Sequence, residues 1–340
     1  MTKPSISAIV VNWNHGHLLP GCLDALLAQG YAPLEILVVD NASRDSSAEY
    51  LAKHAPALRF HLFPENRGFC HAFNWGIRHT RSDLVLSLNP DTTIEEGFLR
   101  EMVEVVGQAE ERGESAGMVA PKLLQAGSPD LLDSTGLFID RQRRPYDRGQ
   151  GQPDRGQYDA LPYTYGACGA AALYRRSMLQ DLAPDGQVFD EVFFAYYEDA
   201  DLAWRAQLRG WHCLYAPRAV ATHARGGGDS LRQRGRAAKD ATGPRLALRN
   251  RYLMTAKNDT AGHFLSDLPR ILAAEIPRLA YTAVTRPAVL LGLYDLVRAL
   301  LAARQKRRRN RQRQTVDDAR IRRWFTAPAD LAAGRQERAR

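Results

Sequence analysis

The sequence predicts an α/β fold with a doubly wound sheet, because buried strands and amphipathic helices alternate over residues 5–88. Residues 5–12 are rich in Ile and Val, as expected of a strand buried on both faces of a sheet. Residues 17–29 carry apolar side chains at helical spacing, and Gly30 is a natural stop. The alternation continues with predicted strands at 35–40, 58–63 and 84–88 and predicted helices at 46–54 and 69–79. Alternation at this short spacing is typical of α/β sheets with helices on both faces.

The pattern changes in the second half of the chain. From about residue 117 the alternation is irregular, and a polar stretch at 140–159 is predicted to be a mobile loop. A helix is expected again at 199–210, followed by a short strand. After the glycines at 226–228 the chain is predicted to be helical and amphipathic, then strongly basic. We therefore expect an α/β domain over 1–255, an amphipathic helical region over 256–303 and a basic tail over 304–340.

Composition is that of a globular protein with one charged end. Hydrophobic residues make up 45% of the 340 residues and charged residues 25%, which is enough to build a sizeable core. Residues 301–340 hold 13 Lys/Arg against 4 Asp/Glu, so the other 300 residues hold 33 basic and 34 acidic side chains. The net charge of +8 is therefore a property of the C-terminal end.

Cysteine usage and hydropathy predict a cytoplasmic protein that does not span a membrane. The four cysteines are far apart and form no CxxC pair, which argues against a zinc site or a disulfide framework. The first residues show no signal-peptide pattern. No apolar run reaches the ~18 residues of a membrane span, and the best candidate, 288–303, is interrupted by Asp295 and Arg298.

Polar side chains follow the predicted strands, where open α/β sheets bind their ligands. They are Asn12, Asp40, Asn41, Arg67, Asn89 and Asp91. Helix capping alone could account for any one of these positions, but less readily for four strand ends together. Neither GxGxxG nor GxxxxGK[ST] is present, which disfavours dehydrogenase-type and P-loop binding. Side chains would then read the nucleotide, and a carboxylate in Asn89-Pro90-Asp91 could hold a divalent cation against a diphosphate.

Two further segments carry candidate catalytic groups. Glu198, Asp199 and Asp201 begin a predicted helix directly after a run of aromatic and apolar residues. Acidic caps of a helix are one explanation. Packing beside the apolar run would instead raise the pKa of a carboxyl group and suit it to general-base catalysis. His223 precedes the glycine-rich segment and could bind the metal or the diphosphate, although a lone histidine is more often structural.

Taken together, these motifs resemble the family 2 glycosyltransferases with a GT-A fold, and most closely their rhamnosyltransferase-like branch. The resemblance covers residues 5–255 and implies a mixed, mostly parallel central sheet flanked by helices, with a C-terminal helical appendage. Its motifs are AIVVNWN at 8–14, VVDNAS at 38–43, ENRGF at 65–69, LNPDT at 88–92, GA at 166–167 before AAL at 171–173, YEDADL at 197–202, and His223.

The resemblance implies a role for each matched residue. Asn12, Asp40, Asn41 and Arg67 would bind the donor nucleotide together with Asn89 and Asp91. Asn89 replaces the first acid of the family's DxD motif, so Asp91 would be the main carboxylate ligand of Mg²⁺ or Mn²⁺, with His223 beside it. Asp199 would be the general base and Glu198 its partner.

The implied reaction is single displacement with inversion at the anomeric carbon. The donor most favoured by the resemblance is dTDP-rhamnose, and the acceptor a cell-envelope glycan or its lipid-linked precursor. Other sugars (galactosyl, glucosyl or N-acetylhexosaminyl), a nucleotidyltransferase and a non-catalytic nucleotide-sugar-binding protein are the alternatives. Processive synthases of this superfamily carry QxxRW, which residues 207–211 match only with the wrong spacing.

The C-terminal region combines apolar and basic side chains. Amphipathic helices that lead into the basic run at 306–309 suit an anionic membrane surface, which predicts peripheral association with the inner face of the cell membrane. Packing of these helices on the catalytic domain is the alternative. Nucleic acid is disfavoured as a partner, because the sequence shows no nucleic-acid-binding module.

Overall fold

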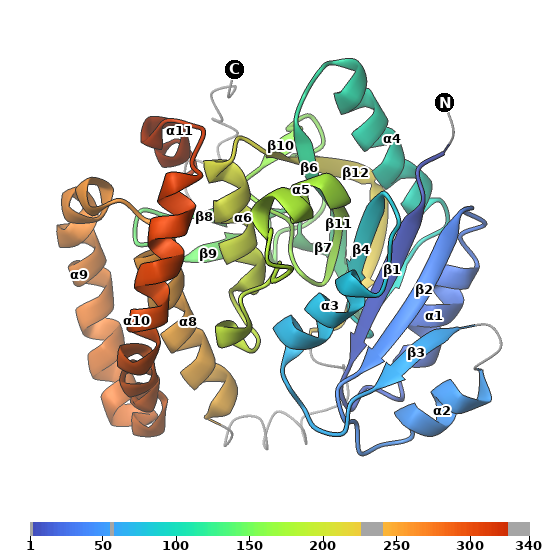
Figure 1. The fold of residues 1–340 in the computed structure, drawn as a ribbon, viewed down its shortest axis with the longest axis horizontal. Helices are drawn as coiled ribbons and strands as arrows, with labels where there is room; N and C mark the ends of the chain where they lie inside the picture. The colour runs from blue at the N-terminus through green and yellow to red at the C-terminus, as the bar shows by residue number, and fades with distance from the viewer. Residues whose placement is uncertain (1–2, 55–57, 226–240, 326–340) are drawn as a thin grey trace.

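The computed structural model describes residues 3–54, 58–225 and 241–325 and places a central sheet between two layers of helices (Figure 1). The sheet strands are β1 (Ile6–Asn12), β2 (Leu34–Asp40), β3 (Arg59–Leu62), β4 (Leu84–Leu88), β5 (Thr92–Ile94), β6 (Ala116–Gln125), β7 (Ser128–Ser134), β10 (Tyr163–Thr164), β11 (Ala171–Arg175) and β12 (His212–His223). A separate hairpin pairs β8 (Leu137–Ile139) with β9 (Pro145–Asp147).

The strand order is β10-β12-β6-β11-β4-β1-β2-β3, with β5 beside β12 and β7 beside β6. Strands β4, β1, β2 and β3 are parallel, so their carboxyl ends lie at one edge. β11 runs antiparallel to its neighbours β4 and β6, whereas β12 is parallel to β6. The predicted mixed, mostly parallel sheet flanked by helices is confirmed.

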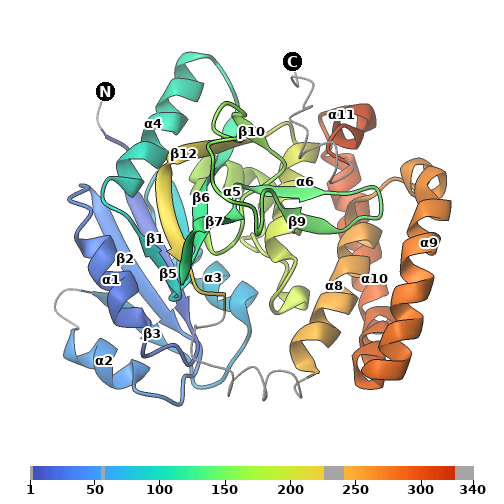
Figure 2. The ribbon, with the colours of Figure 1, turned by 180° about the vertical axis from the view of Figure 1, so that it is seen from behind.

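The helices are α1 (Leu19–Leu27), α2 (Ser47–Lys53), α3 (Phe69–Arg78), α4 (Phe98–Glu111), α5 (Arg176–Leu182), α6 (Glu198–Leu208), α8 (Thr242–Asn258), α9 (Ala261–Thr285), α10 (Leu291–Gln312) and α11 (Asp318–Arg322), with 3₁₀ turns η1 (Glu191–Phe193) and η2 (Pro287–Leu290). Helices α3, α5 and α6 cover one face of the sheet, and α1 and α4 cover the other, seen in the reverse view of Figure 2.

Strand β1 is buried on both faces of the sheet, which explains the nearly continuous apolar run in its sequence. Its side chains alternate between the two faces of the sheet, and all seven residues are buried. Ile9 and Val11 join the core that contains α3, whereas Ala8 and Val10 join the core that contains α1. A strand with helices on both faces has no polar side, so the periodicity of two disappears from its sequence.

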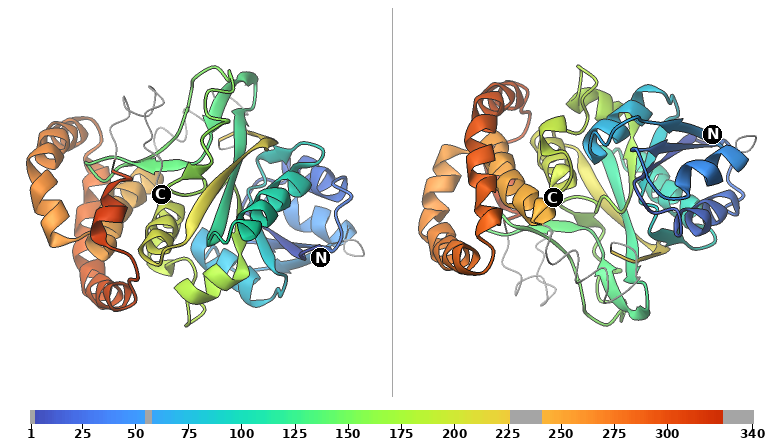
Figure 3. Two further views of the ribbon diagram at one scale, coloured as in Figure 1. Left: turned by 90° about the horizontal axis from the view of Figure 1, so that it is seen from above. Right: turned by 90° about the horizontal axis from the view of Figure 1, so that it is seen from below.

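The C-terminal helices pack onto the α6 side of the α/β domain, with α9 outermost (Figure 3). Both boundaries that we expected there fall inside helices, since α8 continues past residue 255 and α10 past residue 303. Lys306 lies in α10 and forms an ion pair with Asp190. Phe325 is buried and stacks edge-on against Trp204 of α6. The chain as far as residue 325 is therefore attached to the domain, and residues 326–340 of the expected basic tail lie outside the described residues.

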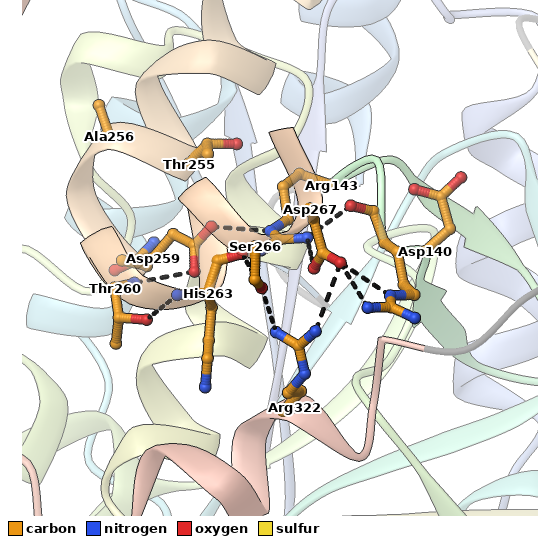
Figure 4. Close-up of polar contacts among 12 residues, drawn as sticks. Asp140, Arg143, Thr255, Ala256, Asp259, Thr260, His263, Ser266, Asp267 and Arg322 are labelled. Carbon is orange, nitrogen blue, oxygen red and sulfur yellow. Dashed lines mark hydrogen bonds and ion pairs between the residues drawn. The ribbon is translucent and has the colours of Figure 1, made fainter. Parts of the chain in front are cut away.

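Residues 140–159 form turns around the short strand β9, as the predicted loop requires, but several of their side chains are buried, which the prediction of a mobile loop did not include. Arg143 is buried between Asp259 and Asp267, with its guanidinium nitrogens 2.7 and 2.8 Å from their carboxylate oxygens (Figure 4). Arg322 of α11 also reaches Asp267. The polar composition that predicted a loop also supplies a buried ion network, which joins the β8–β9 hairpin to α9 and α11.

Candidate active site at the carboxyl edge of the sheet

The ends of β1 and β2 carry the first pair of candidate donor-binding residues. Asn12 and Asp40 are paired in the parallel register, and Asn12 Nδ2 donates to Asp40 Oδ2 at 2.7 Å. The Ser43 amide and hydroxyl also donate to Asp40, at 2.8 and 2.7 Å. Asn12 Oδ1 is buried and has no hydrogen-bond partner within the described ranges. Asp40 therefore holds the turn after β2, and Asn12 offers an acceptor that an N–H group of a ligand could satisfy.

Asn41 and Arg67 meet one strand further along. Asn41 Nδ2 donates to Asn66 Oδ1 at 2.8 Å, and the Arg67 amide donates to Asn41 Oδ1 at 2.9 Å. The side chain of Arg67 is exposed, and its nearest carboxylate, that of Glu65, lies 3.9 Å away. Asn41 thus fixes the loop that presents the guanidinium of Arg67, a group suited to phosphate or to a base edge.

Asp91, in the turn before β5, lies next to His223 at the end of β12. β5 and β12 pair next to the turn after β4, and His223 Nε2 lies 3.5 Å from Asp91 Oδ1. On the other side of the ring, His223 Nδ1 lies 2.8 Å from Asp133 Oδ2. Burial alone would lower the pKa of His223, but its hydrogen bonds to Asp133 and Asp91 and their charges outweigh burial and raise the pKa to about 9.

Asn89 belongs to the same turn through its main chain. Its amide donates to the Ala170 carbonyl at 2.9 Å, and the Thr92 amide donates to the Asn89 carbonyl at 3.1 Å. The adjacent residue Gly169 donates its amide to Asp199 Oδ2 at 3.0 Å. One loop, before β11, therefore binds both the turn that carries Asp91 and the carboxylate of Asp199.

Asp199 and Glu198 form a half-buried carboxylate pair at the start of α6. The Ala200 amide donates to Asp199 Oδ1 at 2.7 Å. Burial raises the pKa of Asp199, and the charge of Asp147 adds to this, although the amides of Gly169 and Ala200 act against it. Burial and the charge of Asp199 raise the pKa of Glu198. Glu198 Oε2 has no hydrogen-bond partner in the parts of the chain that the structure describes.

The third acid of this segment has a different role. Asp201 is fully buried and is bound by Arg205 at 2.9 Å, by Lys257 at 2.9 Å and by Nδ2 of the Asn258 side chain at 2.8 Å. Burial would raise the pKa of Asp201, but Lys257 and Arg205 outweigh burial and lower it. Asp201 therefore ties α6 to α8 and is not available to a substrate.

The sequence did not indicate Asp133, Asp147 and Arg225 as members of this site. The Arg225 guanidinium lies 2.5 Å from Asp133 Oδ1 and 2.7 Å from Asp147 Oδ2. Asp133 and Asp147 come from β7 and β9, in the stretch where the strand–helix alternation breaks down. No local motif marks them, because their partners lie at least 78 residues away in sequence.

The donor set around Asp91 fits a divalent cation. A carboxylate oxygen suits Mg²⁺ or Mn²⁺, and an imidazole nitrogen favours the transition metal of the two. Asp133 holds the second ring nitrogen of His223, the arrangement that orients a ligating histidine. Within the described residues no group of three or more metal-binding side chains occurs. Phosphate oxygens would therefore have to complete the coordination shell.

A separate groove lies away from these residues. Its volume is about 520 Å³, and it lies between α4 and β12, with Glu101, Tyr163 and Arg218 among its lining side chains. None of the candidate site residues borders it. Its size alone does not make it the reactive centre, since it lacks the carboxylate pair.

Comparison with known proteins decides the family. Residues 7–183 match Glycosyl transferase family 2, which is more than half of the chain. The protein belongs to glycosyl transferase family 2. The predicted family and its GT-A fold are confirmed, whereas the rhamnosyltransferase-like branch is not shown.

Two curated relatives of this family 2 protein are named for N-acetylglucosamine. It is 28% identical over 287 residues to an N-acetylglucosaminyltransferase of Rhizobium sp. (strain N33), covering 80% of this chain and 58% of the relative. It is 25% identical over 218 residues to the poly-beta-1,6-N-acetyl-D-glucosamine synthase of Staphylococcus aureus (strain COL), covering 63% and 48%. The chain thus spans about half the length of the curated relatives it matches.

Two solved structures share the fold. Staphylococcus aureus TarS 1-349 in complex with UDP-GlcNAc gives a TM-score of 0.55 at 16% identity, covering 98% of this chain and 93% of that chain. A mannosyltransferase from Pyrobaculum calidifontis in complex with GDP-Man and Mn²⁺ gives 0.50 at 21% identity, covering 98% and 86%. Identities this low establish the common fold alone.

Proposed function

We propose that this protein transfers a sugar from a nucleotide-diphosphate donor to an acceptor hydroxyl, with inversion at the anomeric carbon and with Asp199 as the general base. The observation that carries the proposal is the loop before β11. Gly169 binds the carboxylate of Asp199, and Ala170 binds the turn that carries Asp91. A candidate base and a candidate diphosphate site are thereby fixed side by side.

The donor would lie along the carboxyl ends of β1, β2 and β4. Asn12 Oδ1 supplies an acceptor for an N–H group of the nucleoside, and Arg67 supplies an exposed cation. Asp91 and His223 would hold Mn²⁺ or Mg²⁺, which when bound neutralises the charge that grows on the leaving diphosphate. Asp133 fixes the ring of His223 through Nδ1.

Asp199 would take the proton of the acceptor hydroxyl as its oxygen attacks the anomeric carbon and the bond to the nucleotide breaks. Burial raises the pKa of this carboxylate, which makes it a stronger base than an exposed aspartate. General-base catalysis of this kind contributes roughly 10²–10⁴-fold. Glu198, whose pKa is raised by burial and by Asp199, would remain protonated beside it and limit the negative charge at the site.

N-acetylhexosamine is the sugar that we propose first. The relatives reported above are named as N-acetylglucosaminyl enzymes, and one structural neighbour was solved with UDP-GlcNAc. These names support the N-acetylhexosaminyl alternative over the rhamnose that the sequence motifs favoured. The proposed acceptor is a cell-envelope glycan or its lipid-linked precursor, since one relative is named as a polysaccharide synthase.

A donor screen tests the proposal. The full chain is given UDP-GlcNAc, dTDP-rhamnose or GDP-mannose with Mn²⁺, and release of nucleoside diphosphate is measured before and after chelation. We expect turnover of UDP-GlcNAc that chelation abolishes. Glu104→Gln on α4, an exposed acid outside the site, is the control and should match the wild type. Failure of every nucleotide sugar to bind would refute the proposed function, whereas turnover of dTDP-rhamnose alone would refute the choice of sugar.

A further inference from the structure

Exposed apolar side chains are concentrated on the two outer C-terminal helices. Of the 13 large hydrophobic side chains exposed in the described part of the chain, nine lie on α9 and α10. Val284, Tyr281 and Tyr294 are 84%, 70% and 63% exposed, near the turn η2 that joins the helices. Soluble surfaces seldom expose so many apolar groups together without a partner. None of the helices in the described ranges has the length and hydrophobicity of a membrane span.

The acidic side chains of α9 and α10 are all ion-paired within the described chain, whereas several of the basic side chains are not. The three acidic residues pair with arginines of the same chain, as Asp267 with Arg143, Glu275 with Arg251 and Asp295 with Arg245. Figure 4 shows Asp267 turned toward Arg143 and Arg322. Some basic side chains of the two helices also pair within the chain, as Lys306 with Asp190 and Arg309 with Asp185. Four others are exposed and form no ion pair with any described residue: Arg286, Arg298, Arg304 and Arg308.

Along one face of α10, apolar side chains in the first half of the helix are followed by arginines in the second half. Tyr294, Val297, Leu301, Arg304 and Arg308 follow at spacings of three and four residues, which places them on one side of the helix. All five side chains are exposed. An apolar stripe with aromatic and arginine side chains is the pattern of helices that lie in a membrane interface.

The turn between the helices lies at the same end of the molecule as the candidate active site. In Figure 1, η2 joins the lower ends of α9 and α10, and the parallel strands β1 and β2 run toward that lower edge. We define the α9–α10 tip as the exposed side chains of Tyr281, Val284, Arg286, Leu291, Tyr294 and Arg298. A surface that met this tip would therefore lie at the same end of the molecule as the carboxyl edge of the sheet.

We propose that the α9–α10 tip docks the protein on an anionic lipid bilayer, with its apolar side chains in the interface and Arg286 and Arg298 against lipid headgroups. Charge complementarity favours this partner over a second copy of the chain. The unpaired charges of the tip are those of arginines, so two identical tips would repel each other, whereas an anionic bilayer would attract them. Docking itself is independent of catalysis. Its consequence, access of the carboxyl edge to a lipid-linked acceptor, rests on the proposed function.

Flotation of the full chain with lipid vesicles tests the docking. Vesicles of phosphatidylcholine with an equal part of phosphatidylglycerol are compared with phosphatidylcholine alone. We expect binding to the anionic vesicles that falls as salt rises. Val284→Ser with Tyr294→Ser, and separately Arg286→Gln with Arg298→Gln, should each weaken binding about tenfold. The matched controls, Leu27→Ser with Leu62→Ser and Arg81→Gln with Arg100→Gln, change exposed side chains elsewhere and should bind as the wild type does.

The outcomes separate docking from the proposed function. Release of nucleoside diphosphate from a soluble donor should be the same in the tip variants, since they leave the site intact. Absence of wild-type binding to anionic vesicles, or tip variants that bind as the wild type does, would overturn the docking proposal. So would light scattering that shows a dimer lost in the tip variants, because the face would then belong to a second copy.

Discussion

At the scale of single residues, the acids at the start of α6 show how environment assigns a role to a carboxylate. Asp199 and Asp201 are two positions apart, and burial acts on both. Asp201 has Lys257 and Arg205 beside it, so its pKa is lowered. Burial raises the pKa of Asp199, and its described partners are the amides of Gly169 and Ala200 and the nearby charge of Asp147. The difference in counter-charge separates a structural acid from a candidate base.

The raised pKa of Asp199 predicts the acid limb of the pH–rate profile. A general base acts when ionised, so the rate falls as pH decreases through the pKa of Asp199, which lies above the ~3.9 of an exposed aspartate. Asp147→Asn removes a charge that raises this pKa and should shift the limb to lower pH. The measurement is the rate of diphosphate release against pH, with Asp130→Asn, an exposed acid near the start of β7, as the control. A wild-type limb at or below pH ~4 would contradict the assignment.

Asp133 is predicted to act on the metal through His223. Asp133→Asn keeps the size of the side chain but removes the charge that orients the ring and also holds Arg225. We expect Mn²⁺ affinity in the presence of UDP to fall about 10–100-fold, as measured by electron paramagnetic resonance titration. Asp130→Asn again serves as the control on the same strand. Unchanged Mn²⁺ affinity would show that the Asp133–His223 contact has no part in metal binding.

At the scale of elements, the β8–β9 hairpin is held by charge rather than by its sheet partners. The hairpin pairs three residues on each strand, and its further β-bridges are single ones, from Leu137 to Gly166 and from Ile139 to Phe325. Arg143 provides the stronger link, since it is buried with Asp259 and Asp267 at the start of α9 (Figure 4). Removing one partner of a buried ion pair leaves an uncompensated charge, which is far more destabilising than the loss of a surface pair.

Arg143→Met should therefore destabilise the protein by about 3–5 kcal/mol, because Asp259 loses the buried partner that the structure gives it. Arg141→Met is the matched control, since Arg141 reaches the same Asp267 but its side chain is 36% exposed. That variant should cost no more than about 1 kcal/mol. Urea unfolding followed by circular dichroism measures both. If the two variants lost the same free energy of unfolding, burial of Arg143 would not be the reason for its stabilising effect.

At the scale of the whole molecule, basic residues of the C-terminal end serve two purposes. Lys306 and Arg309 are bound to Asp190 and Asp185, so they attach α10 to the catalytic domain. Arg304 and Arg308, on the same helix, face outward. The interleaving of inward and outward basic residues explains why the sequence appeared as one continuous basic run. It also reconciles packing of these helices on the domain with a free basic surface.

The sequence was most informative where each contact is local or periodic. The runs in β1 and β2, the helices between them and the polar strand ends all follow from short-range patterns, and Asn12 and Asp40 do meet. Asp133 could not be recognised in this way, because its contact with His223 spans 90 residues. The burial of Arg143 was not predicted for a related reason. A buried arginine with distant acidic partners has the same local composition as a solvated loop.

The most direct test of the central claim is the turnover of Asp199→Asn alongside its affinity for the donor. Asparagine keeps the shape of the side chain and can still accept the hydrogen bond from Gly169, but it cannot take a proton. The account predicts a rate of diphosphate release that is lower by roughly 10²–10⁴-fold, with donor affinity measured by calorimetry close to that of the wild type. A variant that turns over the donor at the wild-type rate would contradict the assignment of Asp199 as the base.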